Sequence, residues 1–190
     1  MTSLRRSSAL ALLFVTSLSL LSCATVQSRV APTDIPDDGV AQRERTDDAL
    51  EYRVGTRIAA PAEKVWAVLT DADGYTSWNT TLQSLTGDIR LDGKLDLVMK
   101  AAPDQTFNIT VTSFEAPRSM VWESGMPMGM FRGVRTFTLL PTDDGATIFA
   151  MSEVYSGSML GMIESNLPDM RPSFEAFATS LKDHVENGGS

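Results

Sequence analysis

Few side chains in this sequence could perform acid–base or nucleophilic chemistry. Among its 190 residues there is one histidine, His184, and one cysteine, Cys23. These counts exclude a disulfide framework, a zinc cage of Cys and His ligands, and any mechanism that needs two histidines. The sequence therefore implies no metal and no cofactor, and no residue is assigned a catalytic role.

Methionine is the most unusual residue in the composition. Three of the ten methionines lie in the segment Gly125–Met130, and Met159, Met162 and Met170 follow the last predicted strand. Flexible thioethers suit the mouth of an adaptable apolar pocket. The alternative is a Cu(I) site, because soft thioethers select that ion.

The overall composition predicts one globular domain, with 43% hydrophobic and 21% charged residues. There are 16 basic and 24 acidic residues, which gives a net charge of −8. A negative field repels phosphate backbones, so no nucleic acid partner is expected.

The N-terminal segment has the pattern of an export signal. Arg5 and Arg6 precede a largely apolar stretch over residues 9–21. The next residues, Leu20-Leu21-Ser22-Cys23, resemble the lipobox of bacterial lipoproteins. That resemblance implies cleavage after Ser22 and acylation of Cys23, and the multiple acyl chains would anchor the protein stably to a membrane. The alternative is an ordinary secreted protein with an unused cysteine.

Removal of residues 1–22 would leave 14 basic and 24 acidic residues, a net charge of −10. The resemblance to lipoproteins also implies that Thr25, a position where aspartate would change the sorting, directs the protein to the outer membrane, so its periplasmic face is the expected location in the bacterial cell envelope. Residues 23–49 lack aromatic side chains and a regular apolar period, so we expect a flexible tether after the acylated cysteine. A solvent-facing helix over residues 40–50 is the alternative.

The remaining sequence alternates in patterns typical of an α+β domain. A strand is predicted at 50–60, a helix at 62–70 and a second helical turn at 73–78. Six further strands joined by short turns are expected to form an antiparallel meander, at residues 82–87, 94–100, 106–115, 118–124, 131–140 and 146–157. An apolar stripe from Met170 to Val185 predicts a final helix of about 17 residues.

This order of elements resembles the START/polyketide-cyclase superfamily, also called SRPBCC, whose members share the helix-grip fold of birch-pollen-allergen-like proteins. The similar segments are Ala60–Trp66, the Tyr75–Trp78 turn, the hairpin from Phe137 to Gly145, and Glu153–Gly157. The resemblance spans residues 50–187, followed by a tail at 188–190. It implies a curved seven-stranded antiparallel sheet wrapped around the C-terminal helix, with two short helices after the first strand.

The resemblance also implies a cavity between the sheet and the helix. With a tight turn at Asp143-Asp144, Leu139 would pair with Ile148, Phe137 with Ala150 and Arg135 with Ser152. The predicted ligand-binding residues are Trp78, Leu97, Met99, Ile109, Trp122, Met128, Met130, Arg135, Phe137, Ala150, Ser152, Phe174, Phe177 and Leu181. Apolar residues at these periods are more often plain core than ligand contacts, and each apolar member has that alternative.

An inward Arg135 would need a partner, water or an anionic ligand head such as a carboxylate. The alternative is a β-bulge that turns Arg135 outward and Glu153 inward. His184, in the last turn of the helix, is interpreted as a cation that favours the helix dipole.

The favoured function is membrane-tethered binding or transport of a small hydrophobic molecule, such as a lipid, a fatty acid or a quinone-like compound. A cyclase or hydratase that uses Arg135, Glu153 or His184 is the second hypothesis, and a module that binds another envelope protein is the third. The oligomeric state is not predicted.

Overall fold

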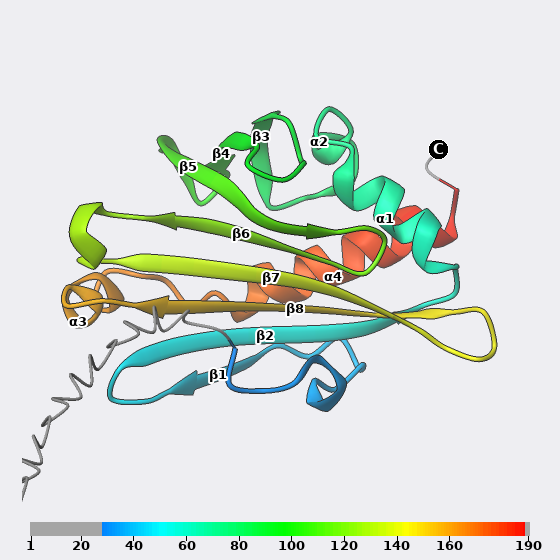
Figure 1. The fold of residues 1–190 in the computed structure, drawn as a ribbon, viewed down its shortest axis with the longest axis horizontal. Helices are drawn as coiled ribbons and strands as arrows, with labels where there is room; N and C mark the ends of the chain where they lie inside the picture. The colour runs from blue at the N-terminus through cyan, green and yellow to red at the C-terminus, as the bar shows by residue number, and fades with distance from the viewer. Residues whose placement is uncertain (1–27, 189–190) are drawn as a thin grey trace, which may run out of the picture.

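The computed structural model describes residues 28–188, which form eight strands, four α-helices and two short 3-10 helices (Figure 1). In chain order these are η1 (Pro32–Asp34), β1 (Gln42–Arg45), β2 (Ala49–Ile58), α1 (Ala62–Thr70), α2 (Tyr75–Trp78), β3 (Leu82–Gly87), β4 (Lys94–Met99), β5 (Ala102–Glu115), β6 (Ser119–Gly125), η2 (Pro127–Gly129), β7 (Arg132–Pro141), β8 (Thr147–Ser156), α3 (Leu160–Glu164) and α4 (Arg171–Glu186).

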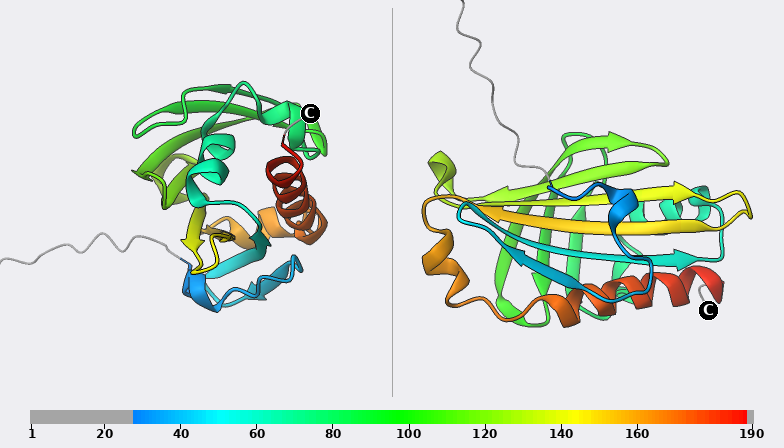
Figure 2. Two further views of the ribbon diagram at one scale, coloured as in Figure 1. Left: turned by 90° about the vertical axis from the view of Figure 1, so that its right-hand side faces the viewer. Right: turned by 90° about the horizontal axis from the view of Figure 1, so that it is seen from below.

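The strands form one antiparallel sheet in the order β1-β2-β8-β7-β6-β5-β4-β3. The sheet curves around α4, and α1 and α2 lie across the same concave side (Figure 2). The α+β class, the antiparallel sheet and the long C-terminal helix agree with the sequence-based prediction. None of the helices in residues 28–188 is long and apolar enough to cross a bilayer.

Helix α4 forms because its apolar residues recur at helical spacing and give it one buried stripe. Phe174, Phe177, Ala178, Leu181 and Val185 are all buried against the sheet. The helix therefore supplies the central layer of the core, and its N-terminal turn faces the middle of the sheet.

The prediction of seven strands was wrong, because β1 adds an eighth at the edge of the sheet. Arg43 on β1 pairs with Tyr52 on β2, and Arg53 on β2 donates hydrogen bonds to Gln42 (2.8 Å) and Glu44 (2.9 Å). Charged side chains are common on exposed edge strands, which pair through the backbone and need no apolar face. The polar run over residues 42–45 therefore forms a strand. Helices α1 and α2 consequently follow the second strand of the chain.

The expected flexible tether is not observed where residues 28–49 are described. Ile35 and Ala41 are buried, and the Gly39 amide donates a hydrogen bond to the Gly55 carbonyl over 2.8 Å. A side chain at Gly55 would clash with this segment, because an added Cβ would lie 2.5 Å from the Pro36 carbonyl oxygen. Gly55 therefore allows residues 32–37 to lie against the outer, convex face of the sheet.

Candidate functional site

The register of the β7–β8 hairpin determines which side chains of these two strands point into the domain. Its loop contains three residues rather than two: the Gly145 amide donates to the Thr142 carbonyl, and Gly145 has φ +80°. A type I turn followed by a left-handed glycine is the usual geometry of three-residue hairpins. The extra residue shifts the register by one. The predicted pairing with Ile148, Ala150 and Ser152 was therefore wrong, and Leu139, Phe137 and Arg135 pair with Phe149, Met151 and Glu153.

This register places Arg135 and Glu153 side by side on the concave face. Arg135 Nε donates a 2.9 Å hydrogen bond to Glu153 Oε2, and Nη2 donates to the same oxygen. The guanidinium carbon also lies 5.5 Å from the ring centroid of Phe174 on α4. The two side chains are only 18% and 11% exposed. The sequence presented Arg135 and Glu153 as alternatives, whereas the structure brings both inward as an ion pair.

Two buried tyrosines belong to the same polar region. Burial raises the pKa of Tyr75 far above its ordinary range, although the Arg135 charge acts in the opposite direction. Burial likewise raises the pKa of Tyr155, and the Glu153 charge adds to this effect. Burial alone would lower the pKa of Arg135, but the charge of Glu153, the hydrogen bond to it and the nearby Tyr155 and Tyr75 together outweigh burial, and the net effect is a raised pKa. The region therefore contains the Arg135 cation, which forms an ion pair with Glu153, and two neutral phenols.

Two indole donors in the core have no hydrogen-bond partner within residues 28–188. They are Nε1 of Trp78 on α2 and Nε1 of Trp122 on β6. Trp122 lies directly opposite Arg135 in the sheet, and its ring centroid is 4.9 Å from that of Phe137. Unpaired buried N–H groups are costly, so each is a donor that a bound molecule or water could satisfy.

The space beside this polar region is small. The interior cavity has a volume of about 20 Å³, which is room for roughly one water molecule. Five predicted ligand-binding residues line it: Leu97, Met99, Arg135, Phe174 and Phe177. Five more were not predicted: Thr81, Leu82, Met151, Met170 and Ser173.

Most other predicted residues lie in the surrounding core rather than at the cavity. These are Trp78, Ile109, Trp122, Phe137 and Leu181, all of which are buried. The placement of Ala150 and Ser152 at the site was wrong, because the corrected register turns them to the outer face together with Ile148. Met151 and Glu153 take their places. The Asp-Asp-Gly sequence of a three-residue hairpin was the signal that could have found them.

The remaining predicted residues are distant from the cavity or outside the described chain. Met128 and Met130 lie in the β6–β7 loop, where Met128 is 92% exposed. His184 is half-buried near Trp78, with ring centroids 6.4 Å apart. Cys23 lies outside the described residues.

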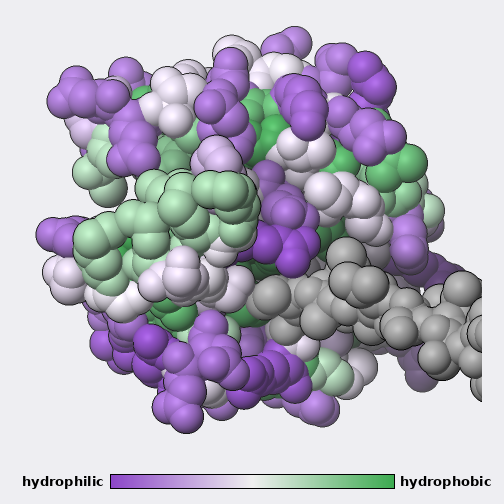
Figure 3. Space-filling model, turned by 60° about the vertical axis from the view of Figure 1, so that its left-hand side comes forward, coloured by the Kyte–Doolittle hydropathy of each residue, from purple (hydrophilic) through white to green (hydrophobic). Residues whose placement is uncertain are grey.

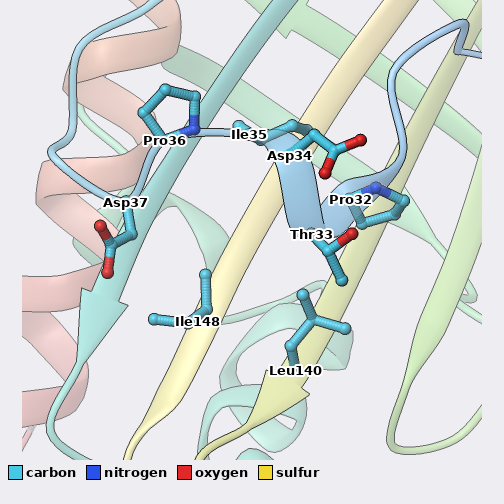
Figure 4. A pocket seen from close by; sticks show the side chains of 8 residues that line it. All are labelled: Pro32, Thr33, Asp34, Ile35, Pro36, Asp37, Leu140 and Ile148. Carbon is cyan, nitrogen blue, oxygen red and sulfur yellow. The ribbon is translucent and has the colours of Figure 1, made fainter.

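A second hollow lies on the opposite, convex side of the sheet. It is an open groove of about 500 Å³, where η1 crosses above Leu140 on β7 and Ile148 on β8 (Figure 4). Its rim carries the carboxylates of Asp34 and Asp37. The concave-side cavity is the stronger candidate site, because it joins charged, aromatic and thioether groups in one buried place.

In residues 28–188 an antiparallel sheet curves around one long helix and encloses an apolar interior that contains the Arg135–Glu153 ion pair. This arrangement defines a class of protein. This chain belongs to the family described as polyketide cyclase/dehydrase and lipid transport, which matches residues 50–186. No curated protein matches the sequence significantly.

Solved structures share the fold at low sequence identity. A conserved protein of unknown function from Enterococcus faecalis has a TM-score of 0.57 and 15% identity, covering 79% of this chain and 79% of that one. Norcoclaurine synthase from Thalictrum flavum, in complex with dopamine and hydroxybenzaldehyde, has a TM-score of 0.57 and 14% identity, covering 75% and 89%. A protein from Rhodobacter sphaeroides has a TM-score of 0.58 and 19% identity, covering 76% and 97%.

Proposed function

We propose that this domain binds a small hydrophobic molecule with an uncharged polar head between α4 and the concave face of the sheet. The head would lie at the Arg135–Glu153 pair, and the apolar part would contact the side chains of Leu97, Phe174 and Phe177. The family description, which includes lipid transport, supports a hydrophobic ligand. The observation that carries the proposal is the buried ion pair beside a cavity lined by thioethers.

The charge of the pair favours a neutral head over the carboxylate that Arg135 alone suggested. Glu153 already balances the guanidinium, so the pair has no net charge. A second carboxylate would lie close to Glu153 in a poorly solvated region, where like charges repel strongly. A hydroxyl or carbonyl group can exchange hydrogen bonds with either partner without this cost.

The small cavity means that binding requires movement. Drug-sized ligands occupy pockets of about 300–1,000 Å³, far above the volume enclosed here. Three of the cavity-lining residues are methionines: Met99 on β4, Met151 on β8 and Met170 at the start of α4. Their flexible side chains can change rotamer at low cost. We therefore expect the cavity to widen between the N-terminal turn of α4 and the β3–β4 hairpin.

Native mass spectrometry of the full chain with Cys23→Ser tests this function, because the substitution removes competing acyl chains. The protein is mixed with 1-decanol, and a complex of one decanol per chain is expected. The control is the double variant Arg135→Met/Glu153→Leu, which keeps the apolar volume but cannot hydrogen-bond the hydroxyl. An equal yield of complex from both proteins, or none from either, would show that the ion pair is no ligand site.

A cyclase or hydratase is the second candidate function. It is favoured by the convergence of Arg135 and Glu153, with Tyr155 close enough for its pKa to respond to both charges. The solved complex of norcoclaurine synthase also has ligands bound to this type of fold. Analysis of the small molecules that co-purify with the protein separates the two functions: a carrier returns its ligand unchanged after incubation, whereas an enzyme alters its mass.

The proposal includes the location of the protein. The lipobox-like residues at Leu20–Cys23 support acylation of Cys23 and attachment to a bilayer in the bacterial envelope. We place the domain at the periplasmic face of the outer membrane, beside a store of hydrophobic molecules. Mass spectrometry of the N-terminal peptide would detect the acyl groups.

A further inference from the structure

One end of the molecule carries a group of exposed methionines, which we call the methionine rim. It consists of Met126, Met128 and Met130 around η2, and Met159 and Met162 at α3. Met126, Met128 and Met162 are 44%, 92% and 58% exposed. Figure 3 shows an apolar patch at this end of the molecule, over the β6–β7 loop and α3. Exposed apolar patches of this kind mark interaction surfaces.

The two halves of the methionine rim are fixed to each other. The Met159 amide donates a 2.9 Å hydrogen bond to the Met130 carbonyl, and the Met126 amide donates a 2.8 Å hydrogen bond to the Phe131 carbonyl. Gly157 packs so closely that an added Cβ would lie 2.5 Å from the Met130 carbonyl oxygen. The rim is therefore a built surface rather than a frayed loop.

Met128 is held in an unfavourable conformation. Its φ of 57° lies in the left-handed region, which side chains other than Gly, Asn and Asp seldom adopt. Since its side chain is 92% exposed, packing within the domain does not compensate for that conformation. An asparagine here would suit the backbone better, so a methionine at this position indicates contact with something outside the domain.

Charges next to the methionine rim are already paired. Arg43 and Arg45 both bind Glu164 on α3, and Arg132 forms two hydrogen bonds of 2.7 Å with Glu123. The chain as a whole is acidic. Contact with an anionic surface would therefore gain little from charge attraction, and the rim is suited to an apolar contact.

The position of Ser28 relates this rim to Cys23. The Ser28 hydroxyl donates a hydrogen bond to Glu51, and Glu51 pairs with Val154 on β8. Val154 is two residues before the end of β8, so it lies about 7 Å from that end of the strand. Only five peptide steps separate Cys23 from Ser28, a reach of at most about 18 Å. An acylated Cys23 therefore holds the methionine rim within a short distance of the bilayer.

We infer that the methionine rim docks on the lipid bilayer that holds the acylated Cys23. This inference rests on the membrane attachment included in the proposed function, and it adds an orientation: η2 and α3 face the lipid. The thioether side chains enter the interface between head groups and acyl chains.

A fluorescence experiment on the full acylated chain tests the orientation. Met128→Cys is labelled with bimane and reconstituted into phosphatidylcholine vesicles in which some lipids carry brominated acyl chains. We expect bromine to quench at least half of the fluorescence at position 128. Met162→Cys is the second site, in case the first variant does not fold. The control is Leu91→Cys in the β3–β4 loop, which is 52% exposed and should stay unquenched.

Three outcomes distinguish the claims. Quenching at 128 or 162 but not at 91 supports docking. Vesicle-bound protein without quenching at 128 and 162 overturns docking, leaves the anchor intact and assigns the rim to a protein partner. Protein that does not co-sediment with vesicles overturns the anchor and docking together, while the binding of 1-decanol remains a separate measurement.

Met128→Asn gives an independent readout without a label. We expect unchanged or slightly higher thermal stability, since asparagine tolerates φ 57°. With Cys23→Ser, which removes the anchor, the full chain should bind phosphatidylcholine vesicles weakly, and Met128→Asn should lower that partition by roughly tenfold. The matched variant Leu91→Asn should leave it unchanged, and an equal loss in both would contradict a specific rim contact.

Discussion

Arg135 donates two hydrogen bonds, from Nε and Nη2, to the same carboxylate oxygen of Glu153. Such a pair is sensitive to the loss of one partner, because the other remains buried with its charge unbalanced. Replacement of both by apolar residues removes that cost. The pair is therefore a determinant of site chemistry rather than an indispensable source of stability.

Glu153→Leu should lower the free energy of unfolding by about 2–4 kcal/mol, because Arg135 would be left without its carboxylate. The double variant Arg135→Met/Glu153→Leu should recover most of this loss. Urea denaturation of the wild type and the two variants measures both values. A double variant no more stable than Glu153→Leu would mean that the pair is essential to the fold.

Thr147 provides a second test at the level of one side chain. Its hydroxyl is buried and donates a 2.8 Å hydrogen bond to the Ala60 carbonyl, which joins β8 to the turn before α1. Thr147→Val should cost about 1–2 kcal/mol, since it leaves that carbonyl unpaired. The exposed Thr106 offers a matched control, because Thr106→Val should change stability by less than about 0.5 kcal/mol. Comparable losses in both variants would argue against the hydrogen bond as the cause.

The site could be predicted only in part, for a reason that lies in one loop. Strand alternation placed Arg135 and Phe137 on one face, because they lie two positions apart on one strand, and the family resemblance implied that this face points inward. The partner strand depends on the hairpin loop, and one additional residue in that loop exchanged Ala150 and Ser152 for Met151 and Glu153. The ion pair could therefore not be predicted before the register of β7 and β8 was known.

At the level of elements, the strands from β3 to β8 and the long helix were predictable from their periods. Strand β1 was not, since an edge strand needs pairing rather than an apolar face. The short helix α3 was also missed, because its five residues contain too few positions to establish a period. The small volume of the cavity depends on side-chain packing, which the spacing of apolar residues along a strand or helix does not reveal.

Gly55 tests whether the N-terminal segment is part of the domain. Gly55→Ala would place a methyl group 2.5 Å from the Pro36 carbonyl oxygen, so we expect residues 32–37 to detach and stability to fall by about 1–3 kcal/mol. Hydrogen exchange should become faster in that segment. Gly161→Ala is the control. It should raise stability slightly, because its position in α3 is open and alanine favours helices. Unchanged exchange at residues 32–37 would mean that the contact does not hold the segment.

The whole molecule combines a buried ion pair, a small interior cavity and a rim of exposed methionines at one end. The fold alone does not select a ligand, because one fold supports many functions. The preference for one kind of ligand follows from the charges of Arg135 and Glu153 in the interior. We expect Glu153 to neutralise Arg135 and so to set a preference for an uncharged head group.

The most direct test is a calorimetric titration at pH 7 of the Cys23→Ser chain and of Cys23→Ser/Glu153→Gln with two ligands of equal length, 1-decanol and decanoate. The first protein should bind decanol at least tenfold more tightly than decanoate. Glu153→Gln keeps the shape but frees the Arg135 charge, so the preference should reverse in favour of decanoate. The same preference in both proteins would contradict this expectation and show that Arg135 and Glu153 do not contact the head group.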